Sequence, residues 1–262
     1  MILGLCSRLD EATLKAVKDI GYRYIETWLP GLCGDENNEK FVTLLRVLEK
    51  NKLRCEVGQM AFPGVYDPEG RQTEEALEKI RIKTYELIKA TSDLNIEKLV
   101  IGAGGARVLS SPDQFSNVME QMADILKNAV SPALDRFGVI AVIEGLVKNE
   151  STILNTTDQS VQLAKMANAP NIKVMVDLYH AANEDEDFND FAKHSGYIMH
   201  SHIGKPVPRV MPSSNDGYDY APFFAALRSA GFNGRMSVEA GLSDPDYITS
   251  IKNAYIALEA LI

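Results

Sequence analysis

The sequence predicts one α/β domain over residues 1–262, a closed (β/α)8 TIM barrel. Three observations predict it. The chain has 262 residues, a length at which single α/β barrels are common. Short apolar runs recur along it, and longer amphipathic stretches separate them. The runs are rich in Val, Ile and Leu without clean alternation, as expected of parallel strands buried on both faces.

Eight of these runs are predicted to be strands. They cover residues 2–6, 24–29, 54–60, 98–104, 139–145, 172–178, 197–204 and 235–240. An open doubly wound sheet is the main alternative architecture. Such a sheet usually has fewer strands, and the glycine-rich turn that follows its first strand is missing here. A closed barrel with a helix after each strand is therefore favoured.

Helix signals are clear in four of the intervening stretches, 7–21, 73–90, 111–138 and 244–262. In the first, Asp10 caps the start and Gly21 ends the helix. The third has Pro112 near its start and is interrupted by Pro132. The second and fourth place apolar residues on one face. The stripe expected in the last comprises Ile248, Ile251, Tyr255, Leu258 and Ile262.

Charge and cysteine content narrow the classes of partner. There are 27 Lys and Arg against 36 Asp and Glu, a net charge of −9, which argues against nucleic acid or an anionic membrane as the main partner. The three cysteines fit no zinc spacing, which indicates a reducing compartment. No signal peptide and no run of about 18 apolar residues is found. A cytoplasmic protein is expected.

Potential ligand residues stand at the ends of four consecutive predicted strands. These residues are Glu144, Asp177, His202 and Glu239. In this fold, chemistry takes place at the C-terminal strand ends, so the four side chains should meet at one side of the barrel mouth. Three carboxylates held close together repel one another, and a divalent cation would compensate. Three oxygen ligands and one imidazole suit Mn²⁺, which we expect, or Mg²⁺; Co²⁺ and Zn²⁺ are alternatives.

The remaining histidines and one further glutamate are less specific. Glu26 is offered by the second predicted strand, and for this residue a substrate contact and a structural salt bridge are equally open. His200 lies two residues before His202, so both point the same way. His202 is nearer the strand end and is the better ligand, whereas His200 either orients it or fills the barrel. His194 is expected on the surface. His180 lies past the end of its strand and suits a contact to substrate oxygens.

Four segments, 142–150, 174–181, 200–209 and 236–240, resemble the metal-site motifs of the xylose isomerase-like TIM barrel superfamily. They are most similar to the sugar phosphate isomerase/epimerase group, which includes the D-tagatose 3-epimerase-like ketose 3-epimerases. The resemblance implies a metal site made of Glu144, Asp177, His202 and Glu239. It also implies that Glu144 and Glu239 are the catalytic residues that move protons. Substrate contacts are implied for His180, Arg209, Glu150 and, from its place in the second strand, Glu26.

The implied function is a metal-dependent isomerase or epimerase of a sugar or sugar phosphate in carbohydrate metabolism. Ketose 3-epimerisation is favoured, because two carboxylates on opposite faces of a metal-stabilised enediolate invert the carbon between them. Returning the proton to the neighbouring carbon would instead give an aldose–ketose isomerase of hydroxypyruvate isomerase type. A phosphate on the sugar would meet Lys205, Arg209, Ser213 and Ser214.

Two further alternatives come from other classes of protein. A DNA-repair nuclease like endonuclease IV shares this barrel but needs many more histidines than the four present here. A barrel that binds sugar and metal without turnover also remains open, although the presence of both glutamates argues against it. By resemblance, the chain is expected to form a homodimer or homotetramer around a small-molecule sugar substrate.

Overall fold

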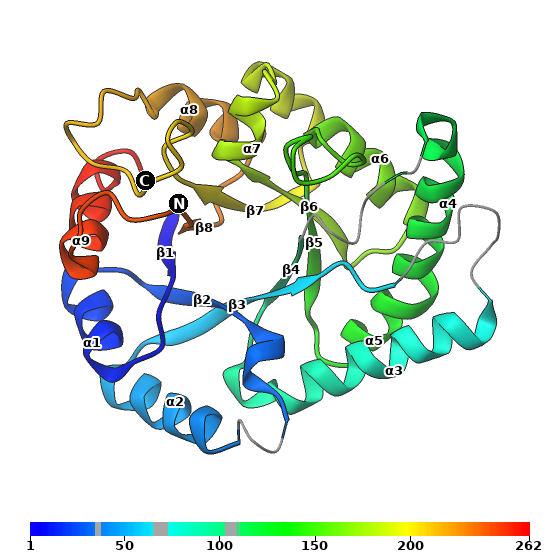
Figure 1. Ribbon diagram of the computed structural model, residues 1–262, viewed down its shortest axis with the longest axis horizontal. Coiled ribbons are helices and arrows are strands. Elements are labelled where there is room, and N and C mark those ends of the chain that lie inside the picture. Colours follow the sequence, from blue (N-terminus) through cyan, green and yellow to red (C-terminus); the bar gives the residue numbers. More distant parts are fainter. Residues whose placement is uncertain (35–37, 65–72, 103–108, 110) are drawn as a thin grey trace.

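The computed structural model describes residues 1–34, 38–64, 73–102, 109 and 111–262. Its strands form one closed barrel in sequence order, and β8 pairs with β1 to complete it (Figure 1). Every pair of neighbours is parallel. The strands are β1 (Ile2–Cys6), β2 (Tyr24–Trp28), β3 (Arg54–Ala61), β4 (Lys98–Gly102), β5 (Ile140–Glu144), β6 (Ile172–Asp177), β7 (Ile198–Ile203) and β8 (Arg235–Val238). The predicted fold and all eight strands are confirmed.

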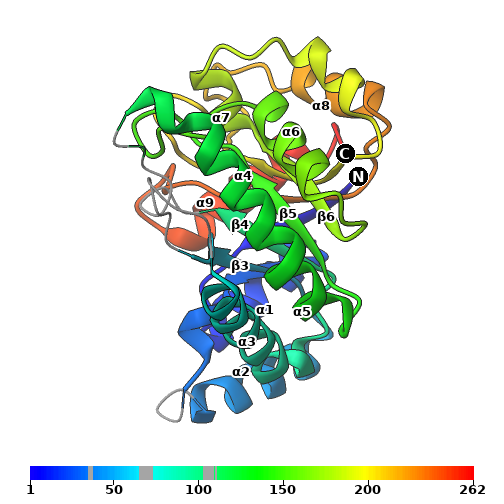
Figure 2. The same cartoon turned by 90° about the vertical axis from the view of Figure 1, so that its right-hand side faces the viewer.

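Helices surround the barrel on its outside, and Figure 2 shows α3, α4, α5 and α6 in front of the strands. Asp10 caps the first helix through its carboxylate, which accepts the Thr13 N–H at 2.9 Å, and Gly21 ends it at a φ of 125°. The helices are α1 (Glu11–Ile20), α2 (Asn38–Asn51), α3 (Glu74–Ala90), α4 (Phe115–Ile125), α5 (Ser131–Asp135), α6 (Thr157–Ala167), α7 (Leu178–Asn183), α8 (Ala221–Ser229) and α9 (Tyr247–Leu258).

Two helices differ in detail from the sequence-based expectation. The stretch around Pro132 bends but does not stop: α4 runs through a π-helical turn, Leu126–Val130, into α5, and Pro132 lies in the first turn of α5. In α9 the buried face includes Ile251 and Leu258, but Ile248 is 36% exposed. The predicted stripe was therefore wrong at Ile248, which lies at the edge of the buried face.

Packing divides the barrel interior into layers. A layer of apolar side chains fills its middle, made of Tyr24, Val57, Val100, Val142 and Met175. The larger core lies between the strands and the outer helices, as expected where both faces of a parallel sheet are covered. Polar side chains occupy the barrel on either side of the middle layer, and those at the C-terminal ends form the site described next. Across the described ranges, no helix is long and apolar enough to span a lipid bilayer.

Candidate active site

Four strand ends bring the predicted ligand set together. Glu144, Asp177 and His202 lie on β5, β6 and β7, and Glu239 follows β8 directly. One ligand atom from each residue lies within 4.8 Å of those of the other three. The His202 Nδ1 atom is 3.4 Å from Glu144 Oε1 and 3.2 Å from Glu239 Oε2. The backbone register pairs Asp177 with His202 across β6 and β7, which places both at the same height in the barrel.

A glycine on the neighbouring strand makes room for Glu144. A Cβ atom added at Gly102, the last residue of β4, would lie 2.3 Å from Glu144 Oε2. Any side chain there would push the carboxylate aside, because contacts below about 3 Å are far inside van der Waals separation. Gly102 was not identified as a site residue from the sequence, although its place at the end of a predicted strand was a usable signal.

Glu26 lies beneath the ligand set and contacts both histidines of β7. Its Oε1 is 2.8 Å from His202 Nε2, and its Oε2 is 2.9 Å from His200 Nε2. The Ser237 hydroxyl donates to Oε2 at 2.6 Å, and Tyr24 lies behind it, 2.9 Å from Ser237 Oγ. Glu26 is fully buried and does not line the pocket. Of the two roles that the sequence left open for Glu26, this position favours the structural salt bridge, in which Glu26 holds the histidines.

The buried side chains of Glu26 and His202 each stabilise the charged form of the other. Burial acts against ionisation of Glu26, but His202 and His200 outweigh it and lower the pKa of the carboxyl well below its usual range. Burial likewise opposes protonation of His202, and Glu26 and Glu239 outweigh it and raise the pKa of the imidazole. With Nε2 held by Glu26, the His202 ring is fixed so that Nδ1 faces the other carboxylates, an arrangement known for metal-binding histidines.

Arg209 joins two of the carboxylates. Its Nη2 atom lies 2.8 Å from both Asp177 Oδ2 and Glu239 Oε2, and its guanidinium stacks 4.3 Å above the Tyr179 ring. The other oxygen of Glu239 accepts the Gln59 amide N–H at 2.8 Å. Burial raises the pKa of Glu239, but His202 and Arg209 outweigh it and bring it down to about 2. Burial dominates at Asp177, whose pKa is raised.

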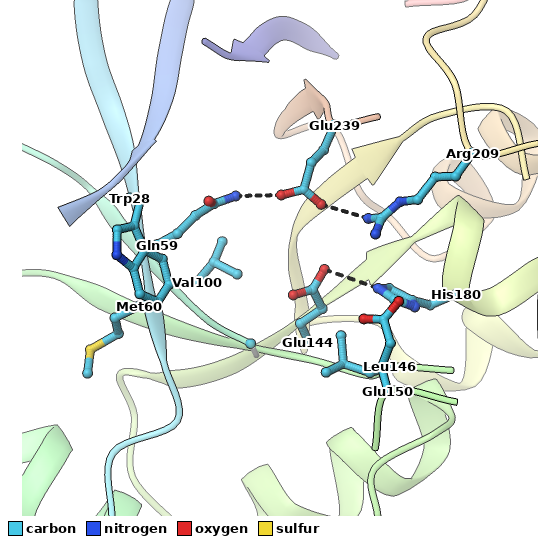
Figure 3. A pocket seen from close by; sticks show the side chains of 11 residues that line it. Trp28, Gln59, Met60, Val100, Glu144, Leu146, Glu150, His180, Arg209 and Glu239 are labelled. Carbon is cyan, nitrogen blue, oxygen red and sulfur yellow. Dashed lines mark hydrogen bonds and ion pairs between the residues drawn. The ribbon is translucent and has the colours of Figure 1, made fainter. Parts of the chain in front are cut away.

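His180 points into the pocket as a hydrogen-bond donor. Its Nδ1 accepts the backbone N–H of Val147 at 3.1 Å, so the proton of the neutral ring belongs on Nε2. That Nε2 lies 3.8 Å from Glu144 Oε1 and 3.7 Å from Asp177 Oδ2. Figure 3 shows the ring beside Glu144 on the same side of the pocket as Arg209.

The cavity above these groups has a volume of about 220 Å³. Figure 3 shows the side chains around it: Trp28, Gln59, Met60, Val100, Glu144, Leu146, Glu150, His180, Arg209 and Glu239. Glu150, His180 and Arg209 therefore lie where the sequence predicted substrate contacts. Gln59, which holds Glu239, was not predicted as a site residue, because a glutamine at a strand end is not a specific signal.

Two other predictions are not supported by the observed positions. His194 was expected at the surface, but it is 6% exposed and pairs with Asp158 at 2.8 Å, so that prediction was wrong. Two of the four residues proposed to meet a phosphate, Lys205 and Ser213, make contacts within their own loop. Lys205 Nζ donates to the Asp216 carbonyl at 2.6 Å, and the Asp216 carboxylate accepts the Ser213 N–H at 2.8 Å.

The donor set fits a divalent cation. Three carboxylates and one imidazole converge from four strand ends, and the ligand atoms of Asp177 and His202 are shielded from water. Arg209 pairs with two of the three carboxylates, Asp177 and Glu239. Oxygen-rich sets with one histidine suit Mn²⁺ and Mg²⁺, and excess negative charge in one buried site is stable when a cation neutralises it.

Comparison with known families agrees with this geometry. The family model described as "Xylose isomerase-like TIM barrel" matches residues 14–257. The chain belongs to this family. Within it, the chain is 28% identical over 157 residues to a D-psicose 3-epimerase of Agrobacterium fabrum, covering 55% of this chain and 52% of that protein. It is 27% identical over 164 residues to an L-ribulose 3-epimerase of Mesorhizobium japonicum, covering 61% and 53% respectively.

These matches span about half the length of the two epimerases. A longer one, 22% identical over 245 residues, is to a putative hydroxypyruvate isomerase of Xenopus laevis and covers 86% of this chain and 82% of that protein. Among solved structures, a D-psicose 3-epimerase in the presence of D-fructose superposes with a TM-score of 0.77 at 17% identity, over 99% of this chain and 98% of the other. A family 2 AP endonuclease of Brucella melitensis reaches 0.72 at 19% identity, over 95% of each chain. The structural likeness at these identities shows the shared fold of the xylose isomerase-like family.

Proposed function

We propose that this protein is an enzyme that epimerises a ketose at C3 with one bound divalent cation. The observation that carries the proposal is the placement of Glu144 and Glu239. The two carboxylates approach one space from opposite sides in Figure 3, each within 3.4 Å of the same nitrogen of His202. The relatives named as D-psicose and L-ribulose 3-epimerases support the reaction class.

Glu144, Asp177, His202 and Glu239 would hold the cation, and Mn²⁺ is the metal that we propose. A bound divalent cation would polarise the carbonyl and hydroxyl oxygens of a ketose and so acidify the C–H bond between them. Glu26 would keep the His202 ring in the ligating orientation.

Proton transfer would fall to the two glutamates. Glu239 stays ionised at neutral pH, because its pKa is lowered to about 2, and it is therefore available as a general base. Gln59 and Arg209 fix its two oxygens. Glu144 faces the opposite side of the substrate carbon, where it would return a proton. Removal from one face and return to the other inverts C3, and the two residues exchange roles in the reverse reaction.

The other polar side chains of the pocket would hold the substrate. His180 Nε2–H would donate to a substrate oxygen beside Glu144, and Glu150 would accept from a hydroxyl at the pocket rim. Val100, Leu146 and Met60 give the pocket apolar walls, which exclude water and strengthen the hydrogen bonds inside. Well-oriented donors and acceptors of this kind hold the reacting carbon between the two carboxylates.

An aldose–ketose isomerase of hydroxypyruvate isomerase type is the second candidate. It is favoured by the Xenopus laevis relative, whose match covers 86% of this chain. The same residues would serve, but the proton would return to the adjacent carbon. In either case no disulfide bond joins Cys6, Cys33 and Cys55 to one another, which supports a reducing compartment such as the cytoplasm.

Hydrogen exchange in D₂O tests the proposal and separates the two candidates. The Mn²⁺-loaded protein is incubated with D-fructose, D-tagatose, D-psicose, L-ribulose and hydroxypyruvate, and each mixture is followed by proton NMR. Epimerisation predicts loss of the C3–H signal of at least one ketose and the appearance of its C3 epimer. Exchange confined to hydroxypyruvate would favour the isomerase. Absence of exchange with every compound would contradict both.

A further inference from the structure

The loop that follows β5 supplies part of the active-site wall. Its residues Leu146 and Glu150 line the pocket, and Figure 3 shows both on the same side as His180. Residues 147–150 form a tight turn, which is closed by a bond of 2.8 Å from the Glu150 N–H to the Val147 carbonyl. The place of Glu150 in the pocket is therefore set by the point at which this turn is anchored.

Two consecutive backbone N–H groups anchor the turn to α7. The Val147 N–H donates to His180 Nδ1 at 3.1 Å, and the Lys148 N–H donates to Glu184 Oε1 at 2.7 Å. His180 and Glu184 are four residues apart, and the Glu184 N–H continues the helical pattern by donating to the His180 carbonyl at 3.1 Å. Residues with this spacing lie on one face of a helix. The two side chains therefore hold the start of the turn together.

The contact between Glu184 and Lys148 is more than a surface ion pair. The Lys148 ammonium lies 2.7 Å from Glu184 Oε2, but the Lys148 side chain is 76% exposed, whereas that of Glu184 is 6% exposed. An ion pair with an exposed, flexible partner contributes little, whereas a backbone N–H on a shielded carboxylate makes a charge-assisted bond of fixed direction. Burial raises the pKa of Glu184, but the ammonium and the backbone N–H of Lys148 outweigh it and lower the pKa. The carboxylate is therefore ionised at neutral pH.

The position of the proton on His180 depends on this anchor. An imidazole that accepts a hydrogen bond at one nitrogen keeps its proton on the other. The Val147 N–H at Nδ1 therefore leaves the proton on Nε2, which lies 3.8 Å from Glu144 and 3.7 Å from Asp177. If the turn moved away from α7, the bond from Val147 would be lost and the proton would be free to occupy either nitrogen.

We propose that Glu184 is a positioning residue of the active site. By holding the Lys148 N–H, it keeps the neighbouring Val147 N–H on the His180 ring, whose proton then points to the substrate. It also fixes Glu150 at the end of the same turn. The roles of His180 and Glu150 as substrate contacts rest on the proposed function, whereas the coupling of Glu184 to the His180 tautomer does not.

Two variants of Glu184 separate the backbone bond from the ion pair. Glu184→Gln keeps an oxygen at the same reach for the Lys148 N–H but removes the charge. Glu184→Asp keeps the charge but shortens the side chain by one methylene, so the flexible ammonium of Lys148 can follow it and the fixed backbone N–H cannot. Under the proposal, Glu184→Gln resembles wild type and Glu184→Asp loses the anchor. A role in the ion pair alone predicts the reverse order.

The ring nitrogens of His180 give the direct readout. Long-range ¹H–¹⁵N spectra of protein labelled with ¹⁵N-histidine are recorded with Mg²⁺, a diamagnetic cation, and His180→Asn identifies the His180 signals among those of the four histidines. Wild type, Glu184→Gln and the control Lys148→Met, which removes the ammonium but not the backbone N–H, should show the proton on Nε2. In Glu184→Asp, the two nitrogen shifts should move toward a common average.

Three NMR results would overturn the proposal. The first is an unchanged His180 tautomer in Glu184→Asp, and the second is an equally large change in Lys148→Met. The third is a wild-type His180 ring protonated on Nδ1, which needs no variant and therefore does not depend on how well a variant folds.

Hydrogen exchange with D-psicose measures the consequence for the substrate. The kcat/KM of Glu184→Asp should fall roughly tenfold, and that of Glu184→Gln and Lys148→Met should stay within about twofold of wild type. Equal losses in Glu184→Gln and Glu184→Asp would overturn the positioning role. If wild type exchanges no hydrogen of D-psicose, the proposed function fails for this ketose, and the tautomer measurement still decides the role of Glu184.

Discussion

The two ends of the barrel both hold clustered charges, but they balance them differently. At the N-terminal end, the floor cluster consists of Arg54, Glu56, Glu97, Lys98 and Arg235. Arg235 pairs with both Glu56 and Glu97, and Arg54 reaches the same two carboxylates at 3.2 and 3.6 Å. At the C-terminal end, Glu144, Asp177 and Glu239 converge with Glu26 below them, and the described contacts to these carboxylates include Arg209 and His202.

This difference indicates that the N-terminal end of the barrel supports the fold, whereas the C-terminal end is suited to chemistry. Each carboxylate of the floor cluster has two arginines beside it, and the cluster ties β3 and β8 together across the barrel. Within the described residues, the C-terminal set brings three carboxylates close enough to share one ligand-sized space, and such crowding of negative charge is relieved when a cation binds. Such a site suits metal binding and proton transfer, as expected for the catalytic face of this fold. Substitutions at the C-terminal end should therefore mainly lower activity, and substitutions in the floor cluster should mainly lower stability.

The largest effect on activity is expected from Glu239→Gln. The variant keeps the shape of the side chain but removes the proposed general base, so hydrogen exchange should fall by about 10²–10⁴-fold. NMR in D₂O measures the rate. The control is Glu97→Gln in the floor cluster, which should exchange at the wild-type rate. Comparable losses in both variants would mean that the two ends do not differ in function.

The largest effect on stability is expected from Arg235→Met. The change leaves the buried Glu56 with only the exposed Arg54 beside it, so the free energy of unfolding should fall by about 3 kcal/mol. Urea unfolding measures it. Arg54→Met is the matched control and should cost less than about 1 kcal/mol, because Arg54 is 58% exposed. Both variants should keep the exchange rate per folded molecule, and a selective loss of activity would contradict the assignment of the floor to support.

Glu26→Gln should weaken metal binding without removing a ligand. The neutral amide holds His202 less firmly and no longer favours its ligating orientation, so Mn²⁺ affinity should fall by about 10–100-fold. Competition with a fluorescent chelator gives the affinity. Ser237→Ala removes only one hydrogen bond to Glu26 and should have a clearly smaller effect. An unchanged affinity in Glu26→Gln would leave Glu26 as a packing residue.

Glu186 is a half-buried carboxyl with no described cation beside it, and it should show a cost that the arginines spare the floor cluster. Burial raises the pKa of Glu186 from 4.5 to about 7, although its carboxylate accepts the Thr157 N–H. The folded state binds this proton more tightly than the unfolded state, so the stabilisation is complete below pH 4.5 and is lost as the pH rises through 7. In wild type this loss should amount to about 1–2 kcal/mol. Unfolding curves at pH 5 and pH 8 should show the difference, and Glu186→Gln should reduce it.

Much of the fold could be read from the sequence because buried parallel strands give unbroken apolar runs. The four candidate ligand residues followed because each stands where such a run ends, and strand ends in a closed barrel share one face. His180 and Arg209 came from resemblance, and their positions at the pocket agree with it.

The depth of a side chain inside the barrel could not be predicted in the same way. Glu144 is the last residue of β5, whereas Glu26 lies two residues before the end of β2, and a register shift between Ile25 and Glu26 accompanies its place in the layer below. Gln59 and Gly102 matter only through the carboxylates they meet across the barrel. Such contacts join strands that are far apart in the chain, so the spacing of residues along the sequence does not predict them.

Metal stoichiometry tests the central claim most directly, that the four strand ends form one cation site. Equilibrium dialysis with Mn²⁺ is carried out on wild type, Asp177→Asn and Glu97→Gln. The account predicts one Mn²⁺ per chain in wild type and in Glu97→Gln, and an affinity more than about tenfold weaker in Asp177→Asn. Absence of Mn²⁺ binding to wild type, or equal binding to all three proteins, would contradict it.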